Sequence, residues 1–184
     1  EFRRVLFRSA EVTPQHLIFT DEALRTFETR YKMNPPIRSD IHRDACVEGL
    51  KDGTIDAVVT DHAPHEWEEK DQEFNLAPSG FVGLETSVGA MLTHLYHTGI
   101  IDLMSLVNVM STAQAKILNL DAGVIAPGKD ADLTFLDLDK EWTVDSSKFY
   151  SKGKSTPFDE MIFKGKAAAT IVNGKFVMKN GEVL

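Results

Sequence analysis

One stretch decides the fold class: Ile55-Asp56-Ala57-Val58-Val59-Thr60-Asp61-His62-Ala63-Pro64-His65. Residues 55–60 form a short, mainly apolar run that is typical of a buried strand. The preceding residues repeat apolar positions at helical spacing, with Ser39 as the expected N-cap and Gly53 at the end of the helix. Strands that alternate with helices and are followed by polar loops indicate a parallel α/β fold.

The helix expected before this strand is amphipathic. One face carries the apolar or small residues Ile41, Ala45, Cys46, Gly49 and Leu50. The charged residues of the segment face the other way, so we expect the apolar face to pack on the strand and its neighbours.

Three polar side chains, Asp61, His62 and His65, come directly after the strand. Loops at the carboxyl ends of parallel strands carry the chemistry of α/β folds. An aspartate and two imidazoles there suit a divalent metal or general acid–base catalysis. An ordinary turn with surface histidines is the alternative. A complete zinc site from these three residues alone is not expected, because ligands so close in a proline-containing turn are hard to direct at one point.

Two further loops are candidate binding sites. Asn34 precedes Pro35-Pro36, which make the loop rigid, and its amide can both donate to and accept from a cyclic amide or ureide. Ser79 and Gly80 lie in a second loop, where the glycine allows the backbone to approach a ligand closely. Taken alone, the sequence of each loop favours an ordinary turn. The remaining histidines, His16, His42, His94 and His97, are expected in structural or solvent-exposed roles.

The apolar pattern changes along the chain. We expect short extended segments at Val12 and at residues 17–19, and helices where apolar residues recur over 84–96 and 103–110. Beyond Pro127-Gly128 the period becomes two, which predicts strands over 131–138, 160–163 and 168–178, with a hairpin turn at Asn173-Gly174. We therefore expect βα units in residues 10–124 and a β-rich domain in residues 125–184.

The composition excludes several classes of protein. The 184 residues carry 20 Lys and Arg against 28 Asp and Glu, a net charge of −8, which argues against nucleic acid and anionic membranes as partners. A single cysteine, Cys46, fits a reducing compartment, and no apolar run approaches the roughly 20 residues of a membrane span. We expect a soluble, cytoplasmic protein.

Residues 1–9 differ from the rest of the chain. They hold three arginines and one acidic residue, and their apolar run is too short for a signal peptide. The segment resembles the in-frame translation of a sequencing-adapter oligonucleotide. We interpret residues 1–9 as a non-native leader joined to part of a longer protein.

Six segments, in this order, resemble the carboxyl-terminal part of the dihydroorotase family, which belongs to the amidohydrolase superfamily. They cover residues 11–17, 34–38, 50–56, 60–65, 83–86 and 127–133. The resemblance implies an α/β fold, in which the carboxyl-terminal part of a TIM (β/α)8 barrel is followed by strands of a small β-sandwich domain. The implied activity is the zinc-dependent, reversible hydrolysis of the cyclic amide of dihydroorotate to N-carbamoyl-L-aspartate in pyrimidine biosynthesis.

The resemblance also implies roles for individual residues. Asp61 is expected to be a ligand of a two-zinc site and the proton shuttle. Asn34 and His65 are expected to contact the substrate, and the backbone around Ser79 and Gly80 to bind its carboxylate or ring. The family's other zinc ligands, including its His-x-His pair, precede the segments found here, so we expect the chain by itself to be inactive.

Two other functions compete with this interpretation. One is a different cyclic-amide hydrolase, such as an allantoinase or hydantoinase, and Asn34 argues against it because allantoinase-like sequences tend to have a small residue there. The other is a non-catalytic scaffold for aspartate transcarbamoylase, which has no need of Asp61 and His65. The expected partners are the small-molecule substrate and, as possibilities, a second copy of the chain or aspartate transcarbamoylase.

Overall fold

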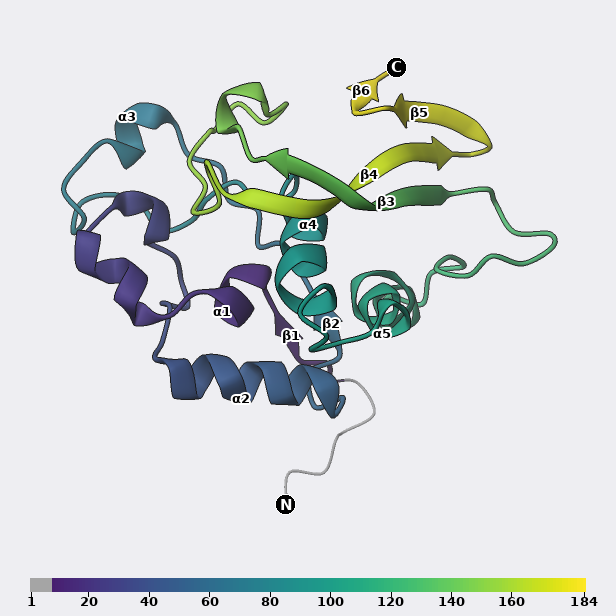
Figure 1. Cartoon of the computed structure of the whole chain (residues 1–184), viewed down its shortest axis with the longest axis horizontal. Helices are drawn as coiled ribbons and strands as arrows, with labels where there is room; N and C mark the ends of the chain where they lie inside the picture. The colour runs from purple at the N-terminus through teal and green to yellow at the C-terminus, as the bar shows by residue number, and fades with distance from the viewer. Residues whose placement is uncertain (1–7) are drawn as a thin grey trace.

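The computed structural model describes residues 8–184 (Figure 1). Most of the predicted leader, residues 1–7, therefore lies outside the described residues. Two sheets are present in the described part. A small parallel sheet pairs β1 (Glu11–Val12) with β2 (Ala57–Val58), and an antiparallel sheet has the strand order β3-β4-β5-β6.

The segment between β1 and β2 is helical. It contains α1 (Pro14–Ile18), two 3-10 turns, η1 (Asp21–Thr26) and η2 (Thr29–Tyr31), and the longer α2 (Asp40–Lys51). The expectation of extended chain at residues 17–19 was wrong for Leu17 and Ile18. Pro14 stands at the start of α1, where its fixed φ favours a helix and its missing N–H costs nothing.

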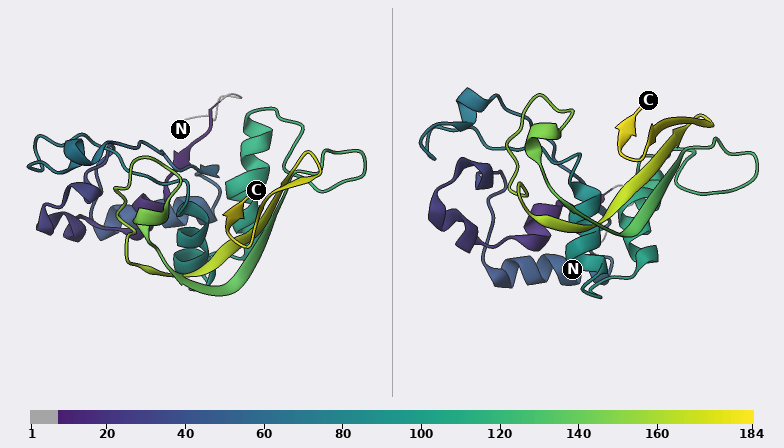
Figure 2. Two further views of the ribbon diagram at one scale, coloured as in Figure 1. Left: turned by 90° about the horizontal axis from the view of Figure 1, so that it is seen from above. Right: turned by 45° about the horizontal axis from the view of Figure 1, so that its top comes forward.

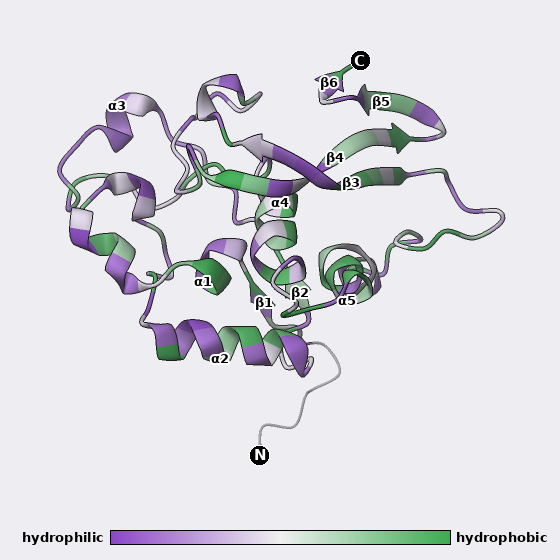
Figure 3. Cartoon of the chain, in the orientation of Figure 1, coloured by the Kyte–Doolittle hydropathy of each residue, from purple (hydrophilic) through white to green (hydrophobic). Residues whose placement is uncertain are grey.

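Helix α2 begins directly after Ser39, as the sequence predicts, although the Ser39 side chain forms no capping hydrogen bond. Gly49 and Leu50 are buried in its last turn. The prediction that Ile41 and Ala45 pack inward was wrong, and 76% of Ile41 is exposed. Figure 3 shows hydrophilic and hydrophobic bands alternating along α2. Only the second half of α2 contributes to the core cluster, so Ile41 and Ala45 in its first half stay exposed.

A series of short helices follows the loop that begins at Asp61. It starts with the short α3 (Trp67–Lys70) and continues, after a second loop, with α4 (Ser87–Met91), which passes directly into the π-helical η3 (Leu92–Tyr96). The next helices are α5 (Leu103–Val107), η4 (Asn108–Thr112) and α6 (Ala113–Ile117). Met91, Leu92 and Leu95 are buried as expected, whereas Leu84 is 59% exposed because it precedes the first turn of α4.

The antiparallel sheet contains β3 (Leu133–Thr143), β4 (Ile162–Val172), β5 (Lys175–Lys179) and β6 (Glu182–Val183). Between β3 and β4 lies one further 3-10 turn, η5 (Ser146–Lys148). The predicted hairpin at Asn173-Gly174 is confirmed, with φ of 49° and 73° at the two residues. Among residues 8–184, no helix is both long and apolar enough to cross a membrane.

Two hydrophobic clusters hold the structure together. The first cluster joins β1, α1, the end of α2 and β2 to the helices within residues 91–109. The second combines residues from both predicted domains: Met33, Ile37, Phe81, Val82, Ala90, Val144, Phe149, Phe158 and Phe163. Strand β4 lies across α4 (Figures 1 and 2), where a Cβ at Gly89 would come within 2.7 Å of the Phe163 ring. The division at residues 124 and 125 stays a prediction.

Candidate functional site

Asp61 lies three residues beyond β2, in an exposed loop whose base is fixed by the core. His62 forms a parallel bridge with the buried Phe81, and the Ala63 N–H donates to the Phe81 carbonyl at 3.0 Å. The φ of Asp61 is 49°, in the left-handed region that few residues other than glycine adopt. Such backbone strain persists where the surroundings enforce it, often at functional sites. The loop thus presents an exposed carboxylate at the carboxyl end of the strand.

The His62 side chain has a structural role. Its Nδ1 accepts hydrogen bonds from the N–H groups of Gly83 at 3.2 Å and Leu84 at 3.3 Å. A ring nitrogen that accepts hydrogen bonds carries no proton, so the neutral ring has its hydrogen on Nε2. His62 therefore ties the loop that precedes α4 to the end of β2.

The structure brings together three of the predicted site residues, His65, Ser79 and Gly80. The Nε2 of His65 lies 3.0 Å from the Ser79 carbonyl oxygen, and its Nδ1 lies 3.2 Å from a carboxylate oxygen of Glu69. Both partners are acceptors, so the ring donates both hydrogen bonds only when it is protonated. A Cβ at Gly80 would lie 3.1 Å from His65 Nε2 and 2.7 Å from the Cβ of Ala63, so the close approach requires glycine.

Asn34 lies on a third loop, two residues after Lys32. The Asn34-Pro35 peptide bond is cis, and the Gly80 N–H donates to the Lys32 carbonyl at 3.0 Å, which joins the loop of Asn34 to that of Gly80. Within residues 8–184, neither the Asn34 amide group nor the Asp61 carboxylate has a hydrogen bond to another side chain of the group. Both side chains are exposed, which leaves their polar atoms open to a ligand.

His16 has the structural role that the sequence predicts. One ring nitrogen is 2.6 Å from the Thr13 hydroxyl and the other is 2.8 Å from the Pro35 carbonyl oxygen. These contacts fix the proline loop on α1. His97 is also bound within the fold, since its Nε2 lies 2.8 Å from the Leu138 carbonyl oxygen on β3.

Two lysines of the site were missed by the sequence analysis. Lys70 is only 3% exposed, and its Nζ donates to the carbonyls of Pro78 at 3.0 Å and Gly80 at 2.9 Å. Burial, and to a lesser degree the positive charge of Lys32, lower the pKa of Lys70 from 10.5 to about 8. Lys32 donates to the carbonyls of Phe74 and Asn75 in the same loop. Lysine is normally exposed, so nothing in the sequence pattern marks these two.

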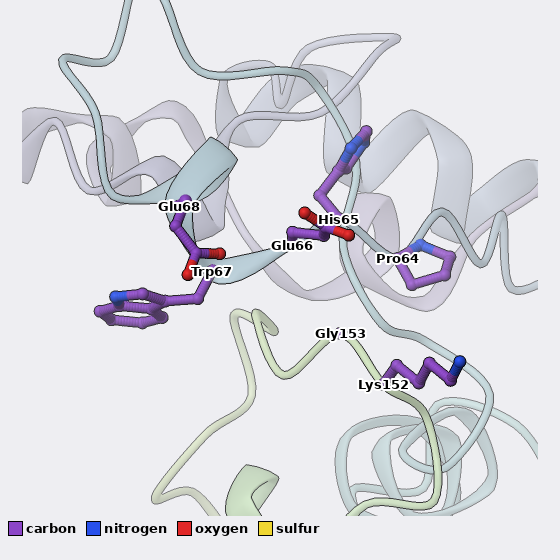
Figure 4. Close-up of a pocket in the computed structure, with 7 residues that line it drawn as sticks. All are labelled: Pro64, His65, Glu66, Trp67, Glu68, Lys152 and Gly153. Carbon is purple, nitrogen blue, oxygen red and sulfur yellow. The ribbon is translucent and has the colours of Figure 1, made fainter.

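A cavity of about 330 Å³ lies beside the backbone of His65. Figure 4 shows the residues that line it, among them Trp67, Lys152 and Gly153, and shows the His65 ring pointing away from Gly153. A Cβ at Gly153 would lie 2.9 Å from the His65 carbonyl oxygen, so the segment around Gly153 packs closely on this loop. Ser79, which contacts the His65 ring, is not among the residues that line the cavity.

A family comparison adds to this geometry. The model of the amidohydrolase family matches residues 6–177, nearly the whole chain. The chain belongs to the amidohydrolase family. The match begins at residue 6, inside the expected leader of residues 1–9.

Curated amidohydrolases similar to this chain are named dihydroorotases. That of Bacillus licheniformis is 46% identical over 176 residues, which cover 96% of this chain and 41% of the relative. The dihydroorotase of Pelotomaculum thermopropionicum is 47% identical over 94% of this chain and 40% of its own length. That of Bacillus subtilis is 44% identical over 96% and 41%. The chain thus spans about 40% of the length of the curated relatives it matches.

Solved amidohydrolase structures have the same fold. The L-hydantoinase (dihydropyrimidinase) of Arthrobacter aurescens aligns with a TM-score of 0.91 at 37% identity, over 96% of this chain and 40% of that protein. The dihydropyrimidinase of Brevibacillus agri aligns with a TM-score of 0.88 at 26% identity, with the same coverage. These likenesses support an α/β protein of the TIM-barrel type.

The side chains of this amidohydrolase chain do not fit a complete metal site. Among residues 8–184, no three His, Cys, Asp or Glu side chains are placed to hold one ion. Asp61 offers a carboxylate, but Nδ1 of His62 and both ring nitrogens of His65 have other partners. A catalytic zinc ion needs about three protein ligands. One exposed carboxylate does not hold the two zinc ions that the resemblance implies.

Proposed function

We propose that this chain is part of a dihydroorotase, a cyclic-amide hydrolase that interconverts dihydroorotate and N-carbamoyl-L-aspartate in pyrimidine biosynthesis. The observation that carries the proposal is the contact of His65, four residues after Asp61, with the Ser79-Gly80 loop, in a chain 46% identical to a dihydroorotase over 96% of its length. In this proposal residues 10–124 are the last βα units of a barrel, and residues 125–184 belong to a small β-rich domain, with its β-sandwich completed elsewhere.

The substrate of this proposal carries a ring amide and a carboxylate. The Asn34 amide can donate to the ring carbonyl and accept from the ring N–H. Nδ1 of His65 contacts a carboxylate oxygen of Glu69, so a substrate carboxylate would bind this nitrogen in place of Glu69. We propose that Asn34, His65 and the backbone of Ser79 and Gly80 bind dihydroorotate in this way.

Asp61 is the proposed catalytic residue. Hydrolysis adds a water oxygen to the ring carbonyl carbon, and the ring nitrogen leaves with a proton. The exposed carboxylate of Asp61 would take the proton from the attacking water and deliver it to the leaving nitrogen. In the proposed enzyme the residues that hold most of a two-zinc site lie outside this chain, and Asp61 is the ligand that the chain contributes.

The hydantoinase alternative has support from the solved structures, at 37% and 26% identity. The two functions differ in the substrate carboxylate, because dihydrouracil has the same ring as dihydroorotate without that group. Steady-state assays of the protein that contains this chain should therefore compare these two substrates. We expect kcat/KM for dihydroorotate to exceed that for dihydrouracil at least a hundredfold. A preference for dihydrouracil would assign the protein to the alternative.

The proposed enzyme acts in the cytoplasm on a small-molecule substrate. The proposal includes association with a second copy of the protein or with aspartate transcarbamoylase. Size-exclusion chromatography, with and without the transcarbamoylase, tests both associations. The exposed carboxylate of Asp61 and the bound ring of His65 favour a catalytic role over that of a pure scaffold. A protein that binds aspartate transcarbamoylase but turns over neither substrate would instead be the scaffold.

A further inference from the structure

Three consecutive carbonyls of the loop Pro78–Gly80 all accept hydrogen bonds from one short segment, residues 65–70. Lys70 Nζ donates to Pro78 at 3.0 Å and to Gly80 at 2.9 Å, and His65 Nε2 contacts the Ser79 carbonyl between them at 3.0 Å. The backbone of the loop is therefore held on both sides of the residue that His65 contacts.

The cation that makes two of these bonds is buried without a carboxylate. Lys70 is the last residue of α3, and its side chain forms no ion pair within residues 8–184. Burying an ammonium costs several kcal/mol unless it is well hydrogen-bonded. The carbonyl oxygens of Pro78 and Gly80 supply these hydrogen bonds to the Lys70 ammonium. The position of the ammonium and the conformation of the Pro78–Gly80 loop therefore depend on each other.

The main chain at Lys70 and the start of the loop are also fixed. The Thr29 hydroxyl donates to the Lys70 carbonyl at 2.6 Å, and Lys32 Nζ donates to Phe74 at 2.7 Å and Asn75 at 3.1 Å. Two ammonium groups thus bind four carbonyls between residues 74 and 80. The loop has little freedom to turn its peptide groups over.

Holding the Pro78 carbonyl sets the direction of the next N–H. In a trans peptide the C=O and the following N–H point in opposite directions. Because the Pro78 oxygen faces Lys70, the Ser79 N–H points away from Lys70. Unlike the Gly80 N–H, which binds the Lys32 carbonyl, the Ser79 N–H has no hydrogen-bond partner in the described part of the chain.

We propose that Lys70 is a positioning residue, which holds the Pro78–Gly80 backbone so that the Ser79 N–H and the His65 ring both face the substrate. The inference rests on the proposed function, because the substrate it names is the anionic dihydroorotate. Lys70 itself is buried behind the loop and acts through Ser79 and His65. A hydrogen bond from an ammonium is stronger than one from a neutral donor, which suits this role.

The test compares Lys70→Met, Lys70→Gln and Lys70→Arg with Lys51→Met in the protein that contains this chain. Lys51 is a matched control, since it is also the last residue of a helix but is exposed. We expect Lys70→Met to raise KM for dihydroorotate at least tenfold and to lower kcat less than threefold, because ground-state and transition-state binding weaken together. Lys70→Arg should recover part of the loss, and Lys51→Met should stay within twofold of wild type.

A readout without substrate separates this inference from the proposed function. In the ligand-free protein, Lys70→Met should shift the ¹⁵N resonances of the His65 ring and of the Ser79 and Gly80 amides, whereas Lys51→Met should not. If the wild type has no dihydroorotase activity, the function fails and these resonances still decide the role of Lys70. If Lys70→Met does not fold, Lys70→Gln replaces it and should raise KM at least threefold. Wild-type KM or unshifted resonances in the folded variant would overturn the proposal.

Discussion

The ring of His65 contacts the carbonyl oxygen of Ser79 at 3.0 Å, across fourteen positions of sequence. The contact is possible because Gly80 leaves no side chain between the loop and the ring. The geometry of the proposed substrate site therefore depends on a glycine as much as on the polar residues around it.

Gly80→Ala should destabilise the protein by about 3 kcal/mol, since a φ of 126° strains alanine and its Cβ would lie 2.7 Å from the Cβ of Ala63. Gly128→Ala is the control, because Gly128 also has a positive φ, 83°, but has open space around it. Its cost should be about 1 kcal/mol. Urea unfolding measures both, and equal losses would contradict the packing argument.

His94 should make the fold sensitive to acid. Burial lowers the pKa of His94 below its ordinary value of 6.5, and its Nε2 has no hydrogen-bond partner among the described residues. The unfolded chain then binds a proton more readily, so the free energy of unfolding falls as the pH drops below about 6.5. His94→Phe should lose less stability between pH 7.5 and pH 5.5 than wild type in thermal unfolding. The exposed His42, replaced by Gln, should behave as wild type.

Lys70 should affect stability at the opposite end of the pH range. Its pKa is about 8 in the folded protein against an ordinary 10.5, so between these values the unfolded chain holds more protons. The free energy of unfolding should therefore rise with pH from about 8 to 10.5, by at most about 3 kcal/mol. Urea unfolding of Lys70→Met at both pH values should lack this rise. A rise of equal size in the variant would assign it to other groups.

The chain alone should hold less than one zinc ion, since within residues 8–184 Asp61 has no second and third metal ligand beside it. Elemental analysis after dialysis against zinc measures the ratio. Two tightly held zinc ions per chain would show that the chain completes a site by itself.

The sequence was most informative where local rules act. The start of α2 after Ser39, the hairpin at Asn173-Gly174 and the buried strand residues Ala57 and Val58 depend on neighbours along the chain, and all three were predicted. Ile41 shows the limit of this approach. Its place in the apolar pattern is right for a helix packed along its whole length, and only the packing of other segments determines that Ile41 stays exposed.

The candidate site was likewise predicted only in part. The positions of Asp61 and His65 follow from the end of a strand, but the contacts of Lys70 with Pro78 and Gly80 depend on how two loops fold onto each other. A lysine in a charged loop looks like any exposed lysine. Its burial is a long-range property, which no spacing in the sequence reports.

Replacement of Asp61 by asparagine, in the protein that contains this chain, tests the proposed chemistry most directly. The rates of dihydroorotate hydrolysis and of N-carbamoyl-L-aspartate cyclisation should both fall by about a thousandfold or more, with an unchanged circular dichroism spectrum. Asp44→Asn, on the exposed face of α2, should keep wild-type rates. Wild-type turnover of both substrates by Asp61→Asn would contradict the assignment of Asp61, and with it the proposed active site.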